Sequence, residues 1–507
     1  PGEEKSVYLA AGTARSLDEC ARLAGKYADR QAFEREMLAQ REIANAYADR
    51  LSVSLPDSYL NRMINVWLKR QMALGKTWGR VYGKGFRDVL QDLSGFVSLE
   101  ACAVRERLLN ALQYQFISGN AIRMFDPILD YPYQDMPVWI PMAVGAYLKE
   151  TGDFSFLKEE IPYYDDERKE SVFCHMKRGI DYLFSHQGRR GLGLWGGGDW
   201  NDSLDNCGMQ GKGESVWLSI ATVKAAEEYL EIVEQADREN CDLSDLPLKI
   251  ERLKGAIRRF GWDGDHFIYG YNDWDEKVGA EENREGKIFL NVQTWAVMTD
   301  ILSLEEKRAL MDTVERRLKC PYGYLQNDPP YETPDDHLGR LTYFSKGVYE
   351  NGSVYNHGVM FKVVADCCIG RGEAAWETLK MIRFDNPLNP ESGVEPYAIC
   401  NMYFGPSAPA KKGFAPQGWI TGSAGWMYRA ITQYMLGIQA DFDGLIVRPC
   451  LPAEWKEVSA VRAFRGATYR IRYVRSGHFA LLADGLPLKG DKIPLFQDGV
   501  HEIVCYC

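Results

Sequence analysis

The run GLWGGGDWNDSLDN, residues 193–206, gathers the side chains in this sequence that are best suited to chemistry. Asp199 and Asp202 flank an aromatic and an amide side chain, and carboxyl groups are common general acids and bases. The glycines at residues 196–198 let a backbone approach a ligand without side-chain interference. This composition predicts a loop built around a sugar ring, and a plain turn or a calcium-like loop is the competing interpretation.

The composition of the chain is that of a globular protein with several domains. Its 507 residues are 46% hydrophobic and carry a formal net charge of −11, spread over both halves. That charge argues against nucleic acid or an anionic membrane as the main partner. No apolar run approaches the roughly 20 residues needed to span a bilayer, and the start lacks a signal-peptide layout, so we expect a cytoplasmic protein.

The cysteines and histidines form no metal-binding pattern. The twelve cysteines include no paired CxxC spacing, and the seven histidines include no HExxH motif. We therefore expect reduced thiols, mostly buried, and no metal site.

The spacing of apolar residues divides the chain into three parts. Residues 1–52 are charged and Ala-rich with helical spacing, which predicts a helical linker; the start at Pro1 without Met suggests the remnant of a preceding domain. Residues 53–438 contain roughly a dozen amphipathic segments between Gly-, Pro- and Asp-rich loops, which predicts paired helices arranged as a toroid. Residues 439–507 change to short alternating runs, typical of a small β-sandwich. The predicted fold class is mainly α.

Individual elements follow from the same patterns. Helices are predicted over residues 215–235, 358–369 and 424–436. Strands are predicted in the runs GLIVRP, ATYRIRYV and HFALLAD of the last part.

The Gly-Asp-rich run closely resembles the acid-bearing loop of glycoside hydrolase family 94, the cellobiose and chitobiose phosphorylases. Further runs recur in the order of that family and extend the resemblance over essentially the entire chain. They are GKGESVW (211–217), GKGFRDVLQDL (83–93), KIFLNVQTWAV (287–297), ENGSVYNH (350–357), GRGEAAWE (370–377), EPYAICNMYFGP (395–406), WITGSAGW (419–426) and RPCLPAEW (448–455).

The resemblance implies an (α/α)6 barrel preceded by a helical linker and followed by a small β-sandwich. The family also carries a large N-terminal β-sandwich domain, which this sequence does not contain. In relatives that domain helps to form the active site across a homodimer. The resemblance therefore implies a possible homodimer and a possible need for the missing domain.

The second Asp of the family's DWND motif is its general acid, which corresponds to Asp202 here. Inverting chemistry needs a protonated carboxyl group beside the leaving oxygen. We expect burial next to Trp200 and near Asp199 to raise the pKa of Asp202. The alternative for Asp202 is an exposed helix N-cap.

A phosphorylase must hold inorganic phosphate, its co-substrate. The resemblance places His357, Thr421 and Gly422 at the phosphate, with Ser423 and Lys212 as weaker candidates. A cationic imidazole with hydroxyl and backbone donors would suit the anion. The alternative for His357 is a packed, hydrogen-bonded histidine.

The resemblance implies that Arg87, Asp88 and Trp200 bind the sugar unit that the enzyme transfers. The two charged residues would bind sugar hydroxyls and the indole would form a wall of the same subsite. A structural ion pair between Arg87 and Asp88 is the alternative.

Aromatic residues elsewhere are candidates for the acceptor side. Asp135 and Trp139 lie in DYPYQDMPVW, and Tyr343 and Phe344 lie in a later loop. Aromatic residues between helices are more often part of the core.

Three positions depart from the cellobiose phosphorylases. Those enzymes carry Arg six positions before the Asp of the FRD run, Gln after their EPY run and Lys before their ENG run; this chain has Tyr82, Asn401 and Tyr349. We place Asn401 and Tyr349 among the substrate-binding residues. The departures leave the reaction type intact and favour a substrate other than cellobiose, such as a β-1,2-linked oligoglucan.

The resulting hypothesis is inverting phosphorolysis of a β-linked glucoside or glucooligosaccharide. The products would be α-glucose 1-phosphate and a shortened acceptor, with no metal or organic cofactor. An inverting hydrolase on the same barrel, with Glu350, Glu395 or Asp336 as the base, is one alternative. A non-catalytic glucan-binding module is another.

Overall fold

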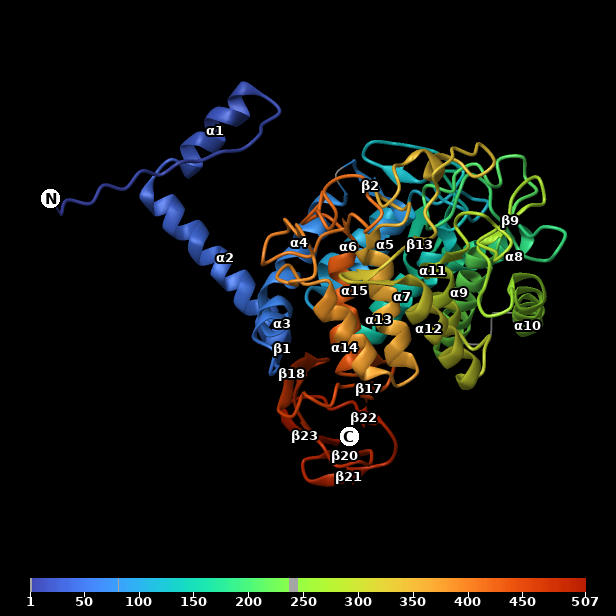
Figure 1. Cartoon of the computed structure of the whole chain (residues 1–507). Coiled ribbons are helices and arrows are strands. Elements are labelled where there is room, and N and C mark those ends of the chain that lie inside the picture. Colours follow the sequence, from blue (N-terminus) through green and yellow to red (C-terminus); the bar gives the residue numbers. More distant parts are fainter. Residues whose placement is uncertain (1, 81, 237–244) are drawn as a thin grey trace.

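The computed structural model describes residues 2–80, 82–236 and 245–507. Most of the chain forms one helical body that also contains short strands between residues 84 and 403. The longer strands are gathered beside it in the C-terminal part, and two N-terminal helices extend away from it (Figure 1). The N-terminal pair is α1 (Leu17–Tyr27) and α2 (Arg30–Arg50), so the predicted helical segment contains two helices. They bury almost nothing, because α1 has no buried residue and α2 has only Ala32.

Six helices of the body form a closed ring. Each of α5, α7, α9, α11, α13 and α15 packs against the next, and α15 packs against α5. The helices of the body and their bounds are α3 (Ser58–Arg62), α4 (Leu68–Trp78), α5 (Phe86–Phe96), α6 (Ala101–Leu112), α7 (Trp139–Thr151), α8 (Val172–Ser185), α9 (Val216–Gln235), α10 (Leu246–Ala256), α11 (Leu290–Val297), α12 (Leu304–Leu318), α13 (Asn356–Cys368), α14 (Gly372–Met381) and α15 (Ser423–Arg429).

The three predicted helices are present with shifted ends. Helix α9 begins one residue after Ser215, whose hydroxyl caps it by accepting from Leu218 N at 3.0 Å. The segment predicted as one helix over residues 424–436 is α15 followed by a π-helical turn, Ala430–Met435. Trp426 in this segment is buried, whereas Tyr434 is only half-buried.

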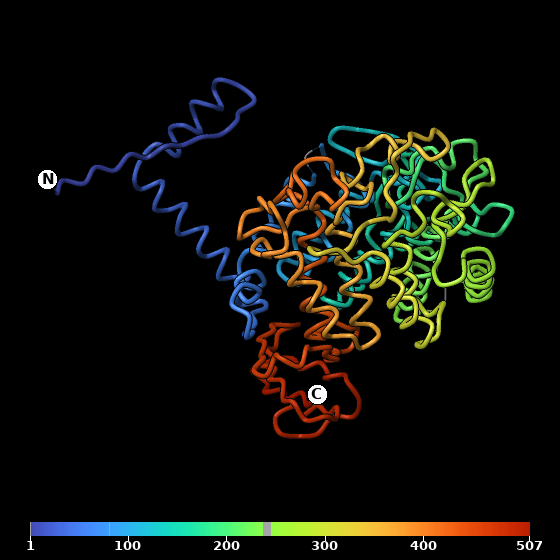
Figure 2. The backbone as a smooth tube through the Cα atoms, in the orientation of Figure 1, coloured from blue at the N-terminus to red at the C-terminus, as the bar shows by residue number. Residues whose placement is uncertain are grey.

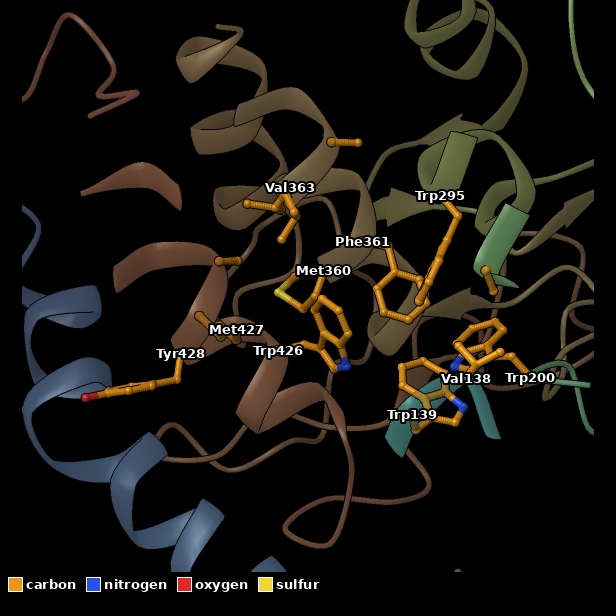
Figure 3. Close-up of a cluster of buried hydrophobic side chains, with 14 of the residues drawn as sticks. Val138, Trp139, Trp200, Trp295, Met360, Phe361, Val363, Trp426, Met427 and Tyr428 are labelled. Carbon is orange, nitrogen blue, oxygen red and sulfur yellow. The ribbon is translucent and has the colours of Figure 1, made fainter. Parts of the chain in front are cut away.

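Aromatic rings fill the middle of the ring of helices (Figure 3). Trp139 meets Trp295 edge-on at 5.5 Å, Trp295 meets Phe361 at 5.5 Å, and Phe361 meets Trp426 at 4.7 Å. Trp200 lies on the same cluster, 5.1 Å from Phe361 between ring centres. Edge-to-face pairs contribute about 0.5–1.5 kcal/mol each beyond their buried area, so this cluster forms a stiff base below Trp200.

The strands of the C-terminal part form two sheets. The larger has the order β1-β18-β19-β23-β20-β21 and the smaller the order β16-β17-β22. All pairs are antiparallel except β19 with β23. The bounds are β1 (Leu51–Ser54), β16 (Ile438–Asp441), β17 (Gly444–Val447), β18 (Val458–Phe464), β19 (Ala467–Val474), β20 (Ala480–Ala483), β21 (Leu486–Leu488), β22 (Lys492–Pro494) and β23 (Val500–Tyr506). The three predicted strands correspond to β17, β19 and β20.

Strand β1 ties the beginning of the body to its end. Leu51 pairs with Arg462 and Ser54 with Ser459, so the blue segment that follows α2 lies beside the red strands (Figure 2). The domain boundary expected between residues 52 and 53 falls inside β1, and the one expected between 438 and 439 falls inside β16.

The eleven cysteines in the described residues are all free thiols, but most of them are not buried as we expected. Only Cys207, Cys320, Cys400 and Cys505 are buried, because several others lie on outward helix faces or in loops. Within the same residues, every helix is too short or too polar to cross a bilayer.

Candidate active site

A cavity of about 640 Å³ collects most of the predicted site residues. Loops and the first turns of ring helices form its wall. The predicted residues that line it are Asp202, His357, Gly422, Arg87, Asp88, Trp200, Asn401 and Tyr349. Thr421 does not line the cavity, but its hydroxyl donates to Asn401 Oδ1 at 2.8 Å and lies 3.0 Å from Ser423 Oγ.

Helix ends bring these residues together. Gly85 is the N-cap of α5, which places Arg87 and Asp88 in the first turn of that helix. His357 is in the first turn of α13, and Gly422 is the N-cap of α15. Since α5, α13 and α15 are neighbours in the ring, residues distant in sequence meet at one end of it.

The three glycines of the acid loop contact protein rather than ligand. Gly198 has φ 140°, and a Cβ there would lie 2.6 Å from a ring carbon of Tyr133. A Cβ on Gly197 would lie 2.9 Å from both Tyr131 and Pro132. None of residues 196–198 lines the cavity. The glycines are therefore needed because this loop packs closely against residues 131–134, which corrects the expectation that they approach a sugar.

Asp202 lies among three arginines. Its carboxylate pairs with Arg87 and, at 3.1 Å, with Arg123 Nη2. Its backbone oxygen accepts from Arg340 Nη2 at 2.7 Å and from Tyr133 Oη at 2.9 Å. Burial alone would raise the pKa of the carboxyl group, but the three guanidinium groups outweigh it and hold the pKa below its usual value. The expected raised pKa is therefore wrong for the substrate-free protein, because its charged neighbours come from distant segments.

Asp199 is the carboxyl group of this loop whose pKa is raised. It is fully buried and accepts hydrogen bonds from Tyr269 Oη at 2.6 Å and from Ser215 Oγ at 2.7 Å. Burial raises its pKa to about 7 despite these donors. Its backbone oxygen accepts from Arg87 Nη1 at 2.6 Å. Asp199 thus holds the loop and Arg87 in place from behind the cavity wall.

Asp135 and Trp139 lie behind Arg87 and not on the acceptor side where we expected them. Both oxygens of Asp135 are 3.1 Å from Arg87 Nη1, and Oδ2 accepts from Trp139 Nε1 at 3.0 Å. Both residues are buried and neither lines the cavity. Arg87 therefore pairs with Asp135 and Asp202, while the nearest cation to Asp88 is Arg80, at 3.4 Å.

The predicted anion site contains His357 and Gly422, together with Arg80. A Cβ built on Gly422 would lie 3.1 Å from both His357 Nδ1 and Arg80 Nη2, so the three groups converge. Burial lowers the pKa of His357 well below its usual value, and Arg80 and Arg87 lower it further. The imidazole is therefore neutral, which corrects the expectation of a cationic one. Lys212 is exposed and does not line the cavity.

The rim of the cavity is aromatic. Tyr349 and Phe344 line it with their ring centres 5.0 Å apart. Tyr349 has φ 49°, a left-handed conformation that is uncommon for a bulky residue and is often found at functional positions. Tyr343 does not line the cavity; it is 58% exposed and donates to Asp336.

Of the carboxylates considered as a hydrolytic base, only Glu350 lines the cavity. Its Oε2 accepts from Ser203 Oγ at 2.9 Å. Burial raises its pKa, and Asp202 raises it further, which disfavours the charged form that a base requires. Glu395 and Asp336 lie outside the cavity lining.

Sequence reasoning missed three arginines. Arg80, Arg123 and Arg340 all line the cavity. Arg80 forms an ion pair with Asp92 at 2.5 Å. It lies two positions before Tyr82, the position at which the cellobiose phosphorylases have an arginine. The other two belong to none of the runs that carry the resemblance. Only their contacts with Asp202 in space identify them.

Comparison with known proteins places the chain in a family. The profile of the glycosyl hydrolase 94 superfamily, catalytic domain, matches residues 45–437. The chain belongs to this superfamily, which confirms the resemblance seen in the sequence.

Particular relatives are known in this superfamily. The chain is 40% identical to solabiose phosphorylase of Paenibacillus borealis over 99% of this chain and 66% of that protein. It is 32% identical to the 3-O-beta-D-glucopyranosyl-beta-D-glucuronide phosphorylase of the same organism, over 93% of this chain and 62% of that protein. The 1,2-beta-oligoglucan phosphorylase of Listeria innocua is 25% identical over 63% of this chain and 32% of that protein. The chain thus spans no more than about two thirds of these relatives.

Proposed function

We propose that this chain is the catalytic part of an inverting β-glycoside phosphorylase. In this proposal the ring of six helices and the helices outside it form an (α/α)6 barrel, and the C-terminal sheets form a small β-sandwich. The main support is that one cavity contains both a carboxyl group, Asp202, and an anion site formed by His357, Gly422 and Arg80. Phosphorolysis needs these two groups, because an acid must protonate the leaving oxygen while a bound phosphate attacks the anomeric carbon.

The reaction would proceed as one in-line displacement. A phosphate oxygen forms the new bond to the anomeric carbon of a β-linked glucosyl unit, while Asp202 gives its proton to the departing oxygen. The configuration inverts, so the products are α-glucose 1-phosphate and the shortened acceptor. Trp200 and Asp88, which line the same cavity, would contact the sugar that is transferred.

Asp202 must gain a proton before it can act as the acid. In the substrate-free protein Arg87 and Arg123 favour its carboxylate form. Bound phosphate brings negative charge into the cavity, and sugar hydroxyls compete for Arg87. Both effects raise the pKa of Asp202 in the complex. No metal or organic cofactor enters this scheme, and phosphate is the co-substrate.

The substrate class is a β-linked glucosyl disaccharide or oligosaccharide. The named relatives act on such substrates, and the higher identity to solabiose phosphorylase than to 1,2-beta-oligoglucan phosphorylase favours a disaccharide over a β-1,2-glucan. A homodimer, a contribution from a further N-terminal domain and a cytoplasmic location stay predictions from the sequence.

The test is to incubate the protein with solabiose and with β-1,2-, β-1,3- and β-1,4-linked glucosides, with and without phosphate. We expect α-glucose 1-phosphate only when phosphate is present. Free glucose formed without phosphate would support the hydrolase, and binding without turnover would support a glucan-binding module. The Asp202→Asn variant should lose several orders of magnitude in kcat while keeping its affinity for the sugar.

A further inference from the structure

Gln91, on helix α5, connects the indole of Trp426 with the imidazole of His357. Trp426 Nε1 donates to Gln91 Oε1 at 2.9 Å, and His357 Nε2 lies 3.1 Å from the same oxygen. All three residues are at least nine-tenths buried, so water does not mediate these contacts. Figure 3 shows Trp426 in the aromatic cluster that fixes its ring.

These contacts determine which nitrogen of His357 carries the proton. An indole N–H can only donate, so the atom of Gln91 that faces Trp426 must be the amide oxygen. The same oxygen faces His357 Nε2, so Nε2 must donate as N–H. In a neutral imidazole the other nitrogen, Nδ1, then has a free lone pair and can only accept.

Nδ1 faces the anion site. A Cβ built on Gly422 would lie 3.1 Å from Nδ1 and 3.1 Å from Arg80 Nη2, and no residue in the described parts of the chain forms a hydrogen bond with Nδ1. The charged groups that act on the imidazole, Arg80 and Arg87, are cationic, and its other neighbours, such as Gln91 and the ring of Trp200, are uncharged. The imidazole therefore stays neutral, and the site combines donors with one acceptor.

We propose that His357 Nδ1 accepts a hydrogen bond from the P–OH group of hydrogen phosphate, and so selects oxyanions that carry a proton. The proton stays on that oxygen of the phosphate, and a different, unprotonated oxygen attacks the sugar. A dianion without a proton, such as sulfate, would place a negative oxygen against the lone pair of Nδ1. This inference rests on the proposed function, because it assumes that the anion site binds phosphate.

The test measures anion binding by titration calorimetry in the absence of sugar, at a mildly alkaline pH where phosphate is mostly HPO4²⁻. Phosphate and arsenate carry a proton there, whereas sulfate and monofluorophosphate are dianions without one. We expect phosphate and arsenate to bind with similar affinity, and the other two to bind weaker by a factor on the order of 100, because a buried acceptor loses its partner. Equal affinity for phosphate and sulfate would overturn the inference.

A Gln91→Glu variant tests the cause of the selectivity. The new carboxylate would hold a proton on both nitrogens of His357, turning Nδ1 into a donor. The ratio of phosphate affinity to sulfate affinity should fall at least about tenfold, because sulfate gains a hydrogen bond where it previously met a lone pair. A ratio that keeps its wild-type value would contradict the inference.

Gln417→Glu is the matched control, since Gln417 also lines the cavity and the change adds the same charge, whereas the hydrogen-bond partner of His357 Nε2 is Gln91. This variant should bind phosphate and sulfate more weakly by a similar factor, so the ratio of the two affinities should not change. In histidine-labelled wild-type protein, 15N NMR should report an unprotonated Nδ1 and a protonated Nε2 for His357. The opposite tautomer would refute the inference even if the variants fail to fold.

The outcomes separate this inference from the proposed function. Tight binding of phosphate and sulfate alike, together with phosphate-dependent turnover, leaves the phosphorylase proposal standing and removes only the selective role of His357. Failure of every anion to bind, with no phosphate-dependent turnover, removes both.

Discussion

Replacing Arg123 should move the pH dependence of catalysis in a direction set by its contact with Asp202. Arg123 Nη2 lies 3.1 Å from Asp202 Oδ2, and the two side chains are 25% and 29% exposed. An opposite charge at such a distance lowers the pKa of a carboxyl group by roughly 1–3 units. Partial exposure screens the pair and Arg87 remains, so the Arg123→Gln change should raise the pKa of Asp202 by about 1 unit, equivalent to about 1.4 kcal/mol.

The assay is kcat for phosphorolysis, at saturating sugar and phosphate, as a function of pH. Activity needs protonated Asp202, so it falls as pH rises through the pKa of this group in the complex. A raised pKa keeps the acid protonated to higher pH, and the alkaline limb of the profile should move up by about 1 unit. The prediction concerns only the pH of the alkaline limb and not the absolute kcat, because Arg123 also lines the cavity.

Lys212→Gln is the matched control for this prediction. It removes the same charge from the exposed part of the acid-bearing segment, outside the cavity. Its alkaline limb should coincide with that of the wild-type protein. If the Arg123→Gln limb stays with the control, or moves to lower pH, the assignment of Asp202 or the electrostatic reasoning is wrong.

Three further predictions concern stability. Asp199 has a folded pKa of about 7 against roughly 3.9 unfolded, so its contribution to stability is full below about pH 4 and is lost as pH rises through 7. Relative to wild type, Asp199→Asn should therefore gain up to ~4 kcal/mol in unfolding free energy between about pH 4 and 7, measured by urea denaturation; no gain would refute the raised pKa. Glu150→Gln should lower the free energy of unfolding by about 3–5 kcal/mol in the same assay. In the wild-type protein Arg462 Nη2 is 2.5 Å from both carboxylate oxygens of Glu150, and the change leaves this buried guanidinium without its counter-charge. Gly95→Ala should cost about 1–3 kcal/mol, since its Cβ would lie 3.0 Å from the backbone of α15, whereas Gly255→Ala, with nothing within 4 Å, should be neutral or stabilising.

The sequence predicted which residues meet but not what surrounds them. Motif runs placed Asp202, His357 and Gly422 in one cavity, because each run begins a helix or a loop at the same end of the ring. The start of α9 was predictable from Ser215, since its cap and its apolar spacing are local. Such features depend only on residues that are close in sequence, so they can be predicted without knowing the fold.

Electrostatic properties could not be predicted in this way. The pKa of Asp202 was expected to rise on the basis of its sequence neighbours, but Arg123 and Arg340 come from segments far away and lower it. The charge of His357 likewise depends on Arg80 and Arg87 across the cavity. These pKa shifts depend on distances in space between residues that are far apart in the sequence, and the sequence alone does not give those distances.

The pairing of β1 with β18 has a consequence for the order in which the protein is made. Leu51 leaves the ribosome roughly 400 residues before its partner Arg462, a delay of about 20 to 80 s at ordinary rates of elongation. During that time the ring helices can pack, but the edge of β1 has no partner. Helix α2 rests on both β1 and β18. Strand β18 therefore helps to fix the position of helix α2, which is synthesised long before it. Nascent chains that stop before β18 should expose the unpaired edge of β1 to other chains.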